Sequence, residues 1–272
     1  MSLTVIVATT GRTTLADAVR TTAGRLPVER FLIVPAERPI DPEVAARADV
    51  QVLAPVAGLF AAWNAAVAEV TTSHAMFVND DDRLDGPPLA SDVLDADRPV
   101  NLPFRRAGGP VRRSVSVSIG SAIVRPVDLL HANRAGNINS FLWPRSVLDR
   151  VGRFVTTYRS CGDIEWLLRF VALEVPVRWL DTPTYVQGRG PERLSAWVGN
   201  GPTIAEERTR LAGVVTAELG PRSATSLLFG AWAAAHRLRA ARDAVIGRSG
   251  RGRGTGDDDG TGEGQSRTTS LR

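Results

Sequence analysis

The chain has 272 residues, of which 43% are hydrophobic and 23% are charged, as in an ordinary globular protein of one large domain or two small ones. Its net charge of +4 comes from 33 basic residues, all of them arginine, and 29 acidic residues; no nucleic-acid-binding motif accompanies it, so we expect no nucleic-acid partner. The single cysteine, Cys161, excludes an intrachain disulfide, and no apolar run approaches the ~20 residues that span a bilayer. We therefore expect a cytoplasmic protein of enzyme size.

The first 80 residues alternate between predicted strands and predicted helices. Short apolar runs rich in β-branched residues predict buried strands at 3–8, 30–35, 50–55 and 74–79. Helices are predicted between them at 13–24, 41–48 and 58–72. This rhythm predicts an α/β fold with a Rossmann-like, doubly wound, mostly parallel sheet.

The rhythm changes after residue 100. The segment 111–121 alternates strictly between polar and apolar residues, which predicts a half-exposed strand in a smaller antiparallel portion. Two more strands are predicted, at 137–143 and 177–186. Helices are predicted at 125–133, 144–152, 163–174, 203–219 and 222–247.

These patterns divide the chain into three parts. We expect one folded domain over 1–220. An amphipathic helix is expected at 221–247, and a tail with almost no apolar residues, expected to be disordered, at 248–272.

Three aspartates, Asp80, Asp81 and Asp82, follow the predicted strand 74–79 directly. In an open parallel sheet, ligands bind outside the carboxyl ends of the strands, where these side chains should lie. A D-x-D pair such as Asp80 and Asp82 can hold Mg²⁺ or Mn²⁺, which in turn accepts phosphate oxygens of a substrate. The alternative is a solvated polar turn, because aspartate is favoured in turns.

Three segments of the chain, in order, resemble the family 2 glycosyltransferases, which have the GT-A fold. The segment "TVIVATTGRTTLADAVRT" resembles the opening strand and helix of the family. The segment "GLFAAWNAAVAEVTTSHAMFVNDDDRL" resembles the helix with its asparagine and the strand that ends in the D-x-D motif. The segment "NSFLWPRSVLDRVGRFVTTYRSCGDIEWLLRFVALEVPVRWLD" resembles the acceptor half, where the family reads roughly F-R-R-x-x-L-x-x-V-G-x-F and then E-D-W-D-L-L-L-R. Together they span most of residues 3–195, and the third is the most specific.

The resemblance implies a metal-dependent, inverting glycosyltransferase that uses a nucleotide-diphospho-sugar donor. It implies that the domain 1–220 is a GT-A glycosyltransferase domain, with a nucleotide-sugar half at about 1–100 and an acceptor half at about 101–200. Asp81, with Asp80 and Asp82, would hold Mn²⁺ or Mg²⁺ and the donor. Asp163 matches the aspartate of E-D and would be the general base that takes the proton from the acceptor hydroxyl. An N-cap role for Asp163 is the alternative, since it stands at the start of a predicted helix.

The resemblance also implies further donor-binding positions. These are Thr9, Thr10 and Arg12 beside the base and ribose, Asn64 on the helix before the metal strand, and Arg189 or Arg193 over the phosphates. Glu37 stands near the place where the family has nucleotide-binding aspartates. The chain departs from the family pattern at Asn79, which replaces the first acid of D-x-D-D, and at Gly162, which replaces the glutamate of E-D.

Two other functions stay open. A nucleotidyltransferase on a similar sheet would need a glycine-rich basic loop after the first strand, where "ATTGRTT" offers one glycine and one arginine. A non-catalytic glycosyltransferase-like subunit would bind a partner through the 222–247 helix, which is basic and amphipathic and could instead contact a membrane peripherally or pack on the catalytic domain. The acceptor hydroxyl could belong to a glycan, a lipid-linked molecule, a protein or a small metabolite.

Overall fold

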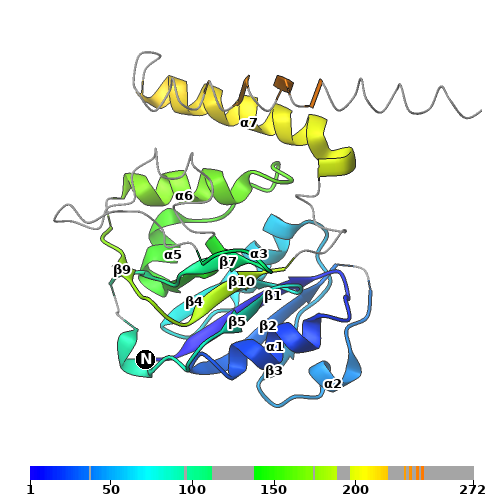
Figure 1. The fold of residues 1–272 in the computed structure, drawn as a ribbon, viewed down its shortest axis with the longest axis vertical. Helices are drawn as coiled ribbons and strands as arrows, with labels where there is room; N and C mark the ends of the chain where they lie inside the picture. The colour runs from blue at the N-terminus through cyan, green and yellow to red at the C-terminus, as the bar shows by residue number, and fades with distance from the viewer. Residues whose placement is uncertain are drawn as a thin grey trace, which may run out of the picture.

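The computed structural model describes residues 1–36, 38–94, 97–111, 138–173, 175–188 and 197–219, with residues 230, 233–234, 237–238 and 240–241. Within these residues, a central sheet is covered by helices on both faces, and a long C-terminal helix lies above one of the helical layers (Figure 1).

The central sheet has seven strands in the order β3-β2-β1-β4-β8-β6-β9. These strands are β3 (Val50–Val52), β2 (Val28–Pro35), β1 (Leu3–Thr9), β4 (His74–Asn79), β8 (Phe141–Pro144), β6 (Val100–Asn101) and β9 (Arg178–Trp179). The first four run parallel to one another, and β8 runs antiparallel to both of its neighbours, β4 and β6. The predicted doubly wound, mostly parallel sheet is therefore confirmed.

Alternation along the central strands explains why both faces are covered. In β1, Val5 and Val7 pack on one face, whereas Ile6 packs on the other. The Val5 face is covered by α1 (Leu15–Ala23) and α2 (Pro42–Ala45). The Ile6 face is covered by α3 (Leu59–Ala68), α5 (Arg145–Val151) and α6 (Gly162–Ala172). The second face carries most of the aromatic core, in which Trp143 and Trp166 meet edge to face with ring centroids 4.9 Å apart.

A second, three-stranded sheet follows the end of β4. Its strand order is β5-β10-β7, with β5 at Arg83–Asp85, β10 at Thr184–Gln187 and β7 at Phe104–Arg106. β10 is antiparallel to β5 and parallel to β7. Two short 3₁₀ helices, η1 (Ser91–Val93) and η2 (Ile138–Ser140), complete this part of the chain. The small sheet brings a late segment of the chain next to the aspartates that follow β4.

The last described helix, α7 (Trp197–Leu219), packs on α6 (Figure 1). Its Leu211 and Val215 are buried, and Ile164 and Leu168 of α6 pack against them. No helix in the described part of the chain is long and apolar enough to cross a membrane. Most of the predicted 222–247 helix and all of the predicted tail lie outside the described residues.

Several sequence predictions need correction. The segment 177–186, predicted as one strand, forms β9 and β10 in two different sheets, because β9 pairs with β6 whereas β10 pairs with β5 and β7. The segment 137–143 begins as η2 before it becomes β8. The strands β5, β6 and β7 were not predicted. The predicted strand 111–121 and helix 125–133 fall outside the described residues, apart from residue 111.

Candidate functional site

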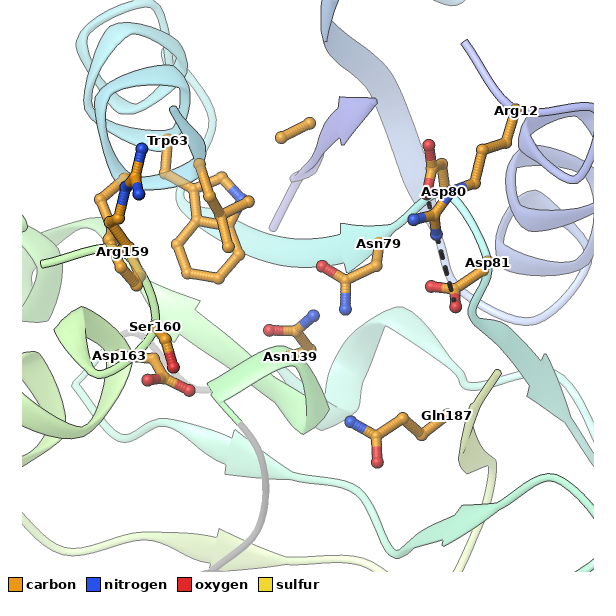
Figure 2. A pocket seen from close by; sticks show the side chains of 13 residues that line it. Arg12, Trp63, Asn79, Asp80, Asp81, Asn139, Arg159, Ser160, Asp163 and Gln187 are labelled. Carbon is orange, nitrogen blue, oxygen red and sulfur yellow. Dashed lines mark hydrogen bonds and ion pairs between the residues drawn. The ribbon is translucent and has the colours of Figure 1, made fainter. Parts of the chain in front are cut away.

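A pocket of about 210 Å³ opens at the carboxyl ends of β1 and β4. It is lined by Ala8, Arg12, Leu59, Phe60, Trp63, Asn79, Asp80, Asp81, Asn139, Arg159, Ser160, Asp163 and Gln187. Figure 2 shows Asp80, Asp81 and Arg12 at one end of this pocket and Asp163, Ser160 and Arg159 at the other. The structure therefore brings Asp80 and Asp81 into the same pocket as Asp163, which follows them by about 80 positions in the sequence.

Asp80 ties the end of β4 to the turn after β1. The carboxylate is 4% exposed, and its Oδ2 accepts hydrogen bonds from the Thr9 hydroxyl at 2.7 Å and the Thr10 backbone amide at 3.1 Å. Its Oδ1 accepts from Nη1 of Arg12 at 3.2 Å. Both carboxylate oxygens of Asp80 are thus engaged by the first-strand loop, which places Arg12 at the pocket.

Asp82 is turned away from the pocket, toward the small sheet, and is 2% exposed. Its Oδ2 accepts a hydrogen bond from Nδ2 of Asn79 at 2.7 Å and one from the hydroxyl of Tyr185 in β10. Its Oδ1 accepts from the backbone amide of Gly188 at 2.7 Å. Burial raises the pKa of Tyr185 well above its ordinary value, and the neighbouring Asp82 carboxylate raises it further, so Tyr185 is a stable hydrogen-bond donor. Asp82 thus fixes the end of β10 against the aspartate turn.

Gly188 approaches this turn more closely than another residue could. A β-carbon at position 188 would lie 2.0 Å from the backbone oxygen of Asp81. The close approach lets the Gly188 amide reach Asp82. Arg189 and Arg193, two predicted donor-binding residues, lie outside the described residues.

Asp81 also lines the pocket, and it lies beside Arg12 (Figure 2). Nη1 of Arg12 lies 3.5 Å from its Oδ2. Within the described residues, no group of three or more His, Cys, Asp or Glu side chains is placed to hold a metal ion. Asp80 and Asp81 both line the pocket, and carboxylate oxygens are the ligand type that suits Mg²⁺ or Mn²⁺, whose shell water and phosphate oxygens would complete.

Asp163 lies at the opposite end of the pocket, in the first turn of α6. Its Oδ1 accepts a hydrogen bond from the backbone amide of Ile164 at 2.8 Å. Burial raises the pKa of Asp163 to about 6, against the opposing effects of the Ile164 amide and the Arg208 guanidinium. A carboxylate with such a pKa is ionised at neutral pH and is a stronger base than an exposed aspartate.

An apolar part of the pocket wall comes from α3. Leu59, Phe60 and Trp63 form this wall, and the rings of Phe60 and Trp63 meet edge to face with centroids 5.7 Å apart. Sequence reasoning did not assign these residues to the site. The helical spacing of 59, 60 and 63 gave a signal for a buried face, but it did not show that the face ends at a pocket.

Four polar residues of the pocket were also not predicted from the sequence: Asn139, Arg159, Ser160 and Gln187. Asn139 donates to the hydroxyl of Tyr185 at 3.2 Å, which places it between the two ends of the pocket. Arg159 and Ser160 precede the predicted base by only four and three positions, so their proximity to Asp163 was the available signal.

Other predicted residues lie elsewhere. The amide of Asn64 pairs with the backbone of Phe154, donating to its oxygen at 2.9 Å and accepting from its nitrogen at 2.8 Å. Asn64 is not among the described residues that line the site; it lines a second pocket, of about 220 Å³. Glu37 falls outside the described residues. Burial raises the pKa of the Cys161 thiol to about 12, so this buried cysteine stays protonated and is not a nucleophile at neutral pH.

No protein-family model and no curated protein matches this sequence. Solved structures share its fold. S. aureus TarS superposes with a TM-score of 0.57 at 13% identity, over 79% of this chain and 40% of that chain. The TarS fragment 1–349 in complex with UDP-GlcNAc has a TM-score of 0.56 at 12% identity, over 79% of this chain and 67% of the fragment. The mannosyltransferase PcManGT from Pyrobaculum calidifontis, in complex with GDP-Man and Mn²⁺, has a TM-score of 0.51 at 14% identity, over 92% of this chain and 79% of that chain.

Proposed function

We propose that this chain is a metal-dependent, inverting glycosyltransferase related to family 2, which transfers a sugar from a nucleotide-diphospho-sugar to an acceptor hydroxyl. The observation that carries the proposal is that Asp81 and Arg12 lie at one end of a pocket and that Asp163, with its raised pKa, lies at the other end of the same pocket. One end of the pocket would bind the charged diphosphate, and the other end carries the carboxylate that would act as general base. This separation suits a displacement in which the leaving group and the nucleophile lie on opposite sides of the reacting carbon.

The Asp81 end would receive the donor diphosphate. Asp81 would hold Mn²⁺ or Mg²⁺, with Asp80 next to it, and the bound cation would neutralise the charge of the departing nucleoside diphosphate. Arg12 lies 3.5 Å from Asp81 and would provide a second positive charge beside the phosphates. Thr9 and Thr10 hold this end of the pocket in place through Asp80.

The Asp163 end would receive the acceptor. The Asp163 carboxylate would accept the proton of the acceptor hydroxyl while that oxygen forms a bond to the anomeric carbon. The bond from the anomeric carbon to the diphosphate oxygen would break with its electron pair moving to the nucleoside diphosphate. The products would be a glycoside of inverted configuration and the free nucleoside diphosphate, so atoms and charges balance without a covalent enzyme intermediate.

Donors with UDP or GDP are the first to test, since TarS has been solved with UDP-GlcNAc and PcManGT with GDP-Man and Mn²⁺. The purified chain should release UDP or GDP from one member of a panel of nucleotide sugars, in the presence of Mn²⁺ and a hydroxyl acceptor. Chelation of the metal should abolish the release.

The base assignment is tested by Asp163→Asn, which keeps the shape of the side chain but cannot take the proton. We expect turnover to fall by about 10²–10⁴-fold. Asp92→Asn, at an exposed position of η1, is the matched control and should keep full activity. Full activity of Asp163→Asn would disprove the role of this residue.

The same assay distinguishes the alternatives. Release of pyrophosphate from a nucleoside triphosphate and a sugar phosphate would indicate a nucleotidyltransferase. Binding of a nucleotide sugar without turnover, with or without Mn²⁺, would indicate a non-catalytic subunit and would overturn the proposed function.

A further inference from the structure

Glu207 is a buried acid in the middle of α7, with 8% of its surface exposed. Its carboxylate does not pair with an arginine of the pocket. Instead it accepts hydrogen bonds from three consecutive backbone amides: from Arg159, from Ser160 at 2.8 Å and from Cys161 at 2.9 Å. Three amides that converge on one carboxylate form an anion-binding turn, and here the anion comes from another helix of the same chain.

The segment that Glu207 binds leads directly into the site. Arg159 and Ser160 line the pocket, and Asp163 follows Cys161 by two residues in the first turn of α6. The first backbone hydrogen bond of α6 runs from the Glu165 amide to the Cys161 oxygen at 3.0 Å. A carboxylate that fixes the amides of 159–161 therefore also fixes the point from which α6 starts.

A second residue of α7 contacts the same segment one turn further on. The guanidinium of Arg210 lies over the ring of Tyr158, 4.5 Å from its centroid, and donates to the Thr157 hydroxyl at 3.1 Å. Glu207 and Arg210 are three residues apart and so lie on one face of the helix. The apolar contact of α7 with Ile164 and Leu168 of α6 lies beside them.

From this geometry we infer that Glu207 is a positioning residue for the reaction: it holds the 159–161 turn, and with it the general base Asp163, from α7. The inference rests on the proposed function for its catalytic consequence, but the anchoring of the turn can be tested without it. If α7 served stability alone, its apolar residues would be enough to pack it on α6. Burying the Glu207 carboxylate costs desolvation free energy, so its presence there indicates that the hydrogen bonds to 159–161 have a role besides packing.

The anchoring is tested by amide hydrogen exchange of the full chain. Glu207→Gln keeps the volume, but an amide has one acceptor oxygen and its NH₂ group faces the backbone N–H groups that the carboxylate bound. We expect the amides of 159–161 to exchange at least about tenfold faster in this variant. Glu206→Gln, at the exposed neighbouring position, is the matched control and should exchange as the wild type does.

The catalytic consequence is tested by steady-state kinetics of the same variants. Because the donor end of the pocket is built on other elements, Glu207→Gln should lower kcat by about 10–100-fold and leave the KM for the nucleotide sugar unchanged. If Glu207 had a purely structural role, the Glu207→Gln variant would unfold at a lower temperature but would not show a lower kcat at an unchanged KM. Glu207→Ala should lower kcat further if it folds, and the glutamine variant carries the test if it does not.

The outcomes separate the two proposals. Exchange at 159–161 that matches the wild type in Glu207→Gln, or an unchanged kcat, overturns the positioning role. If the wild-type chain turns over no nucleotide sugar, the proposed function fails, and faster exchange in Glu207→Gln would still establish that α7 anchors the turn.

Discussion

The ring of Phe60 in α3 lies directly against the backbone of Gly162 at the start of α6. A β-carbon at position 162 would be 2.6 Å from Cε2 and 2.7 Å from Cδ2 of this ring, closer than carbon atoms approach in a packed protein. An aromatic ring therefore takes the space that a side chain at position 162, directly before Asp163, would occupy.

This contact predicts that Gly162→Ala is destabilising. The added methyl group must displace Phe60 or the first turn of α6, and such overpacking costs about 1–3 kcal/mol in the free energy of unfolding. Thermal and urea denaturation would measure it. Gly213→Ala in α7 is the control, because a β-carbon there meets no atom within 4 Å and alanine is the better helix former. In a Phe60→Ala background the cost of Gly162→Ala should disappear; an equal cost in both backgrounds would contradict the contact.

The raised pKa of Asp163 predicts the pH dependence of the reaction. The base must be ionised to accept a proton, and burial raises its pKa to about 6. We therefore expect kcat/KM to fall about tenfold per pH unit below pH ~6 and to level off above it. A profile measured from pH 4 to 8 with the preferred donor would show this. A limb near pH ~4, the value of an exposed aspartate, would mean that the base is solvated or is another residue.

The same burial predicts that Asp163 limits stability at neutral pH. Its folded pKa, about 6, exceeds the ordinary value of 3.8, so the folded state binds the proton more tightly and loses stability as pH rises through this window. Asp163→Asn removes that cost. We expect the variant to unfold at a higher temperature than the wild type at pH 8, by a free energy on the order of 1 kcal/mol.

The pH dependence of the stability gain in Asp163→Asn provides a control. Below pH ~4 the carboxyl is protonated in both states, so the advantage of Asp163→Asn should shrink there. Asp92→Asn, at an exposed position, should change stability little at either pH. A constant advantage of Asp163→Asn at all pH values would mean that ionisation is not its cause.

The elements predicted well from the sequence are those with a strong local pattern. β4 was predicted with its observed bounds, because a mostly apolar run of six residues, five of them buried in the structure, precedes a charged turn. The strands that were missed, such as β6 (Val100–Asn101), are two or three residues long and exist only through pairing with distant segments. Such short strands carry no period of their own, so local patterns do not reveal them.

Local sequence patterns also explain why only part of the candidate site could be predicted. The aspartate turn and the E-D-like segment could be found because each is a compact motif. Tyr185 and Glu207 could not be found in this way, because their partners are distant in the sequence. Tyr185 donates to Asp82, 103 residues earlier, and Glu207 accepts from the amides of 159–161, 46–48 residues earlier. In the sequence, Glu207 is one of several charged residues on a polar helix, and only the packing of α7 on α6 makes it an anchor.

The different environments of Asp81 and Asp82 predict two different defects. Asp82→Asn replaces a carboxylate that accepts three hydrogen bonds in a buried place, so it should lower the free energy of unfolding by about 1–3 kcal/mol and loosen the end of β10. Asp81→Asn should cost less stability and should instead remove the effect of Mn²⁺ on UDP or GDP binding, which calorimetry with and without the metal would measure. Tyr185→Phe serves as the partner test for Asp82, because it deletes one donor to this carboxylate, together with the acceptor of the Asn139 amide, and leaves Asp82 in place. If Asp82→Asn abolishes the Mn²⁺ effect while keeping wild-type stability, and Asp81→Asn does not, then the aspartate turn rearranges on donor binding and Asp82 is the metal ligand.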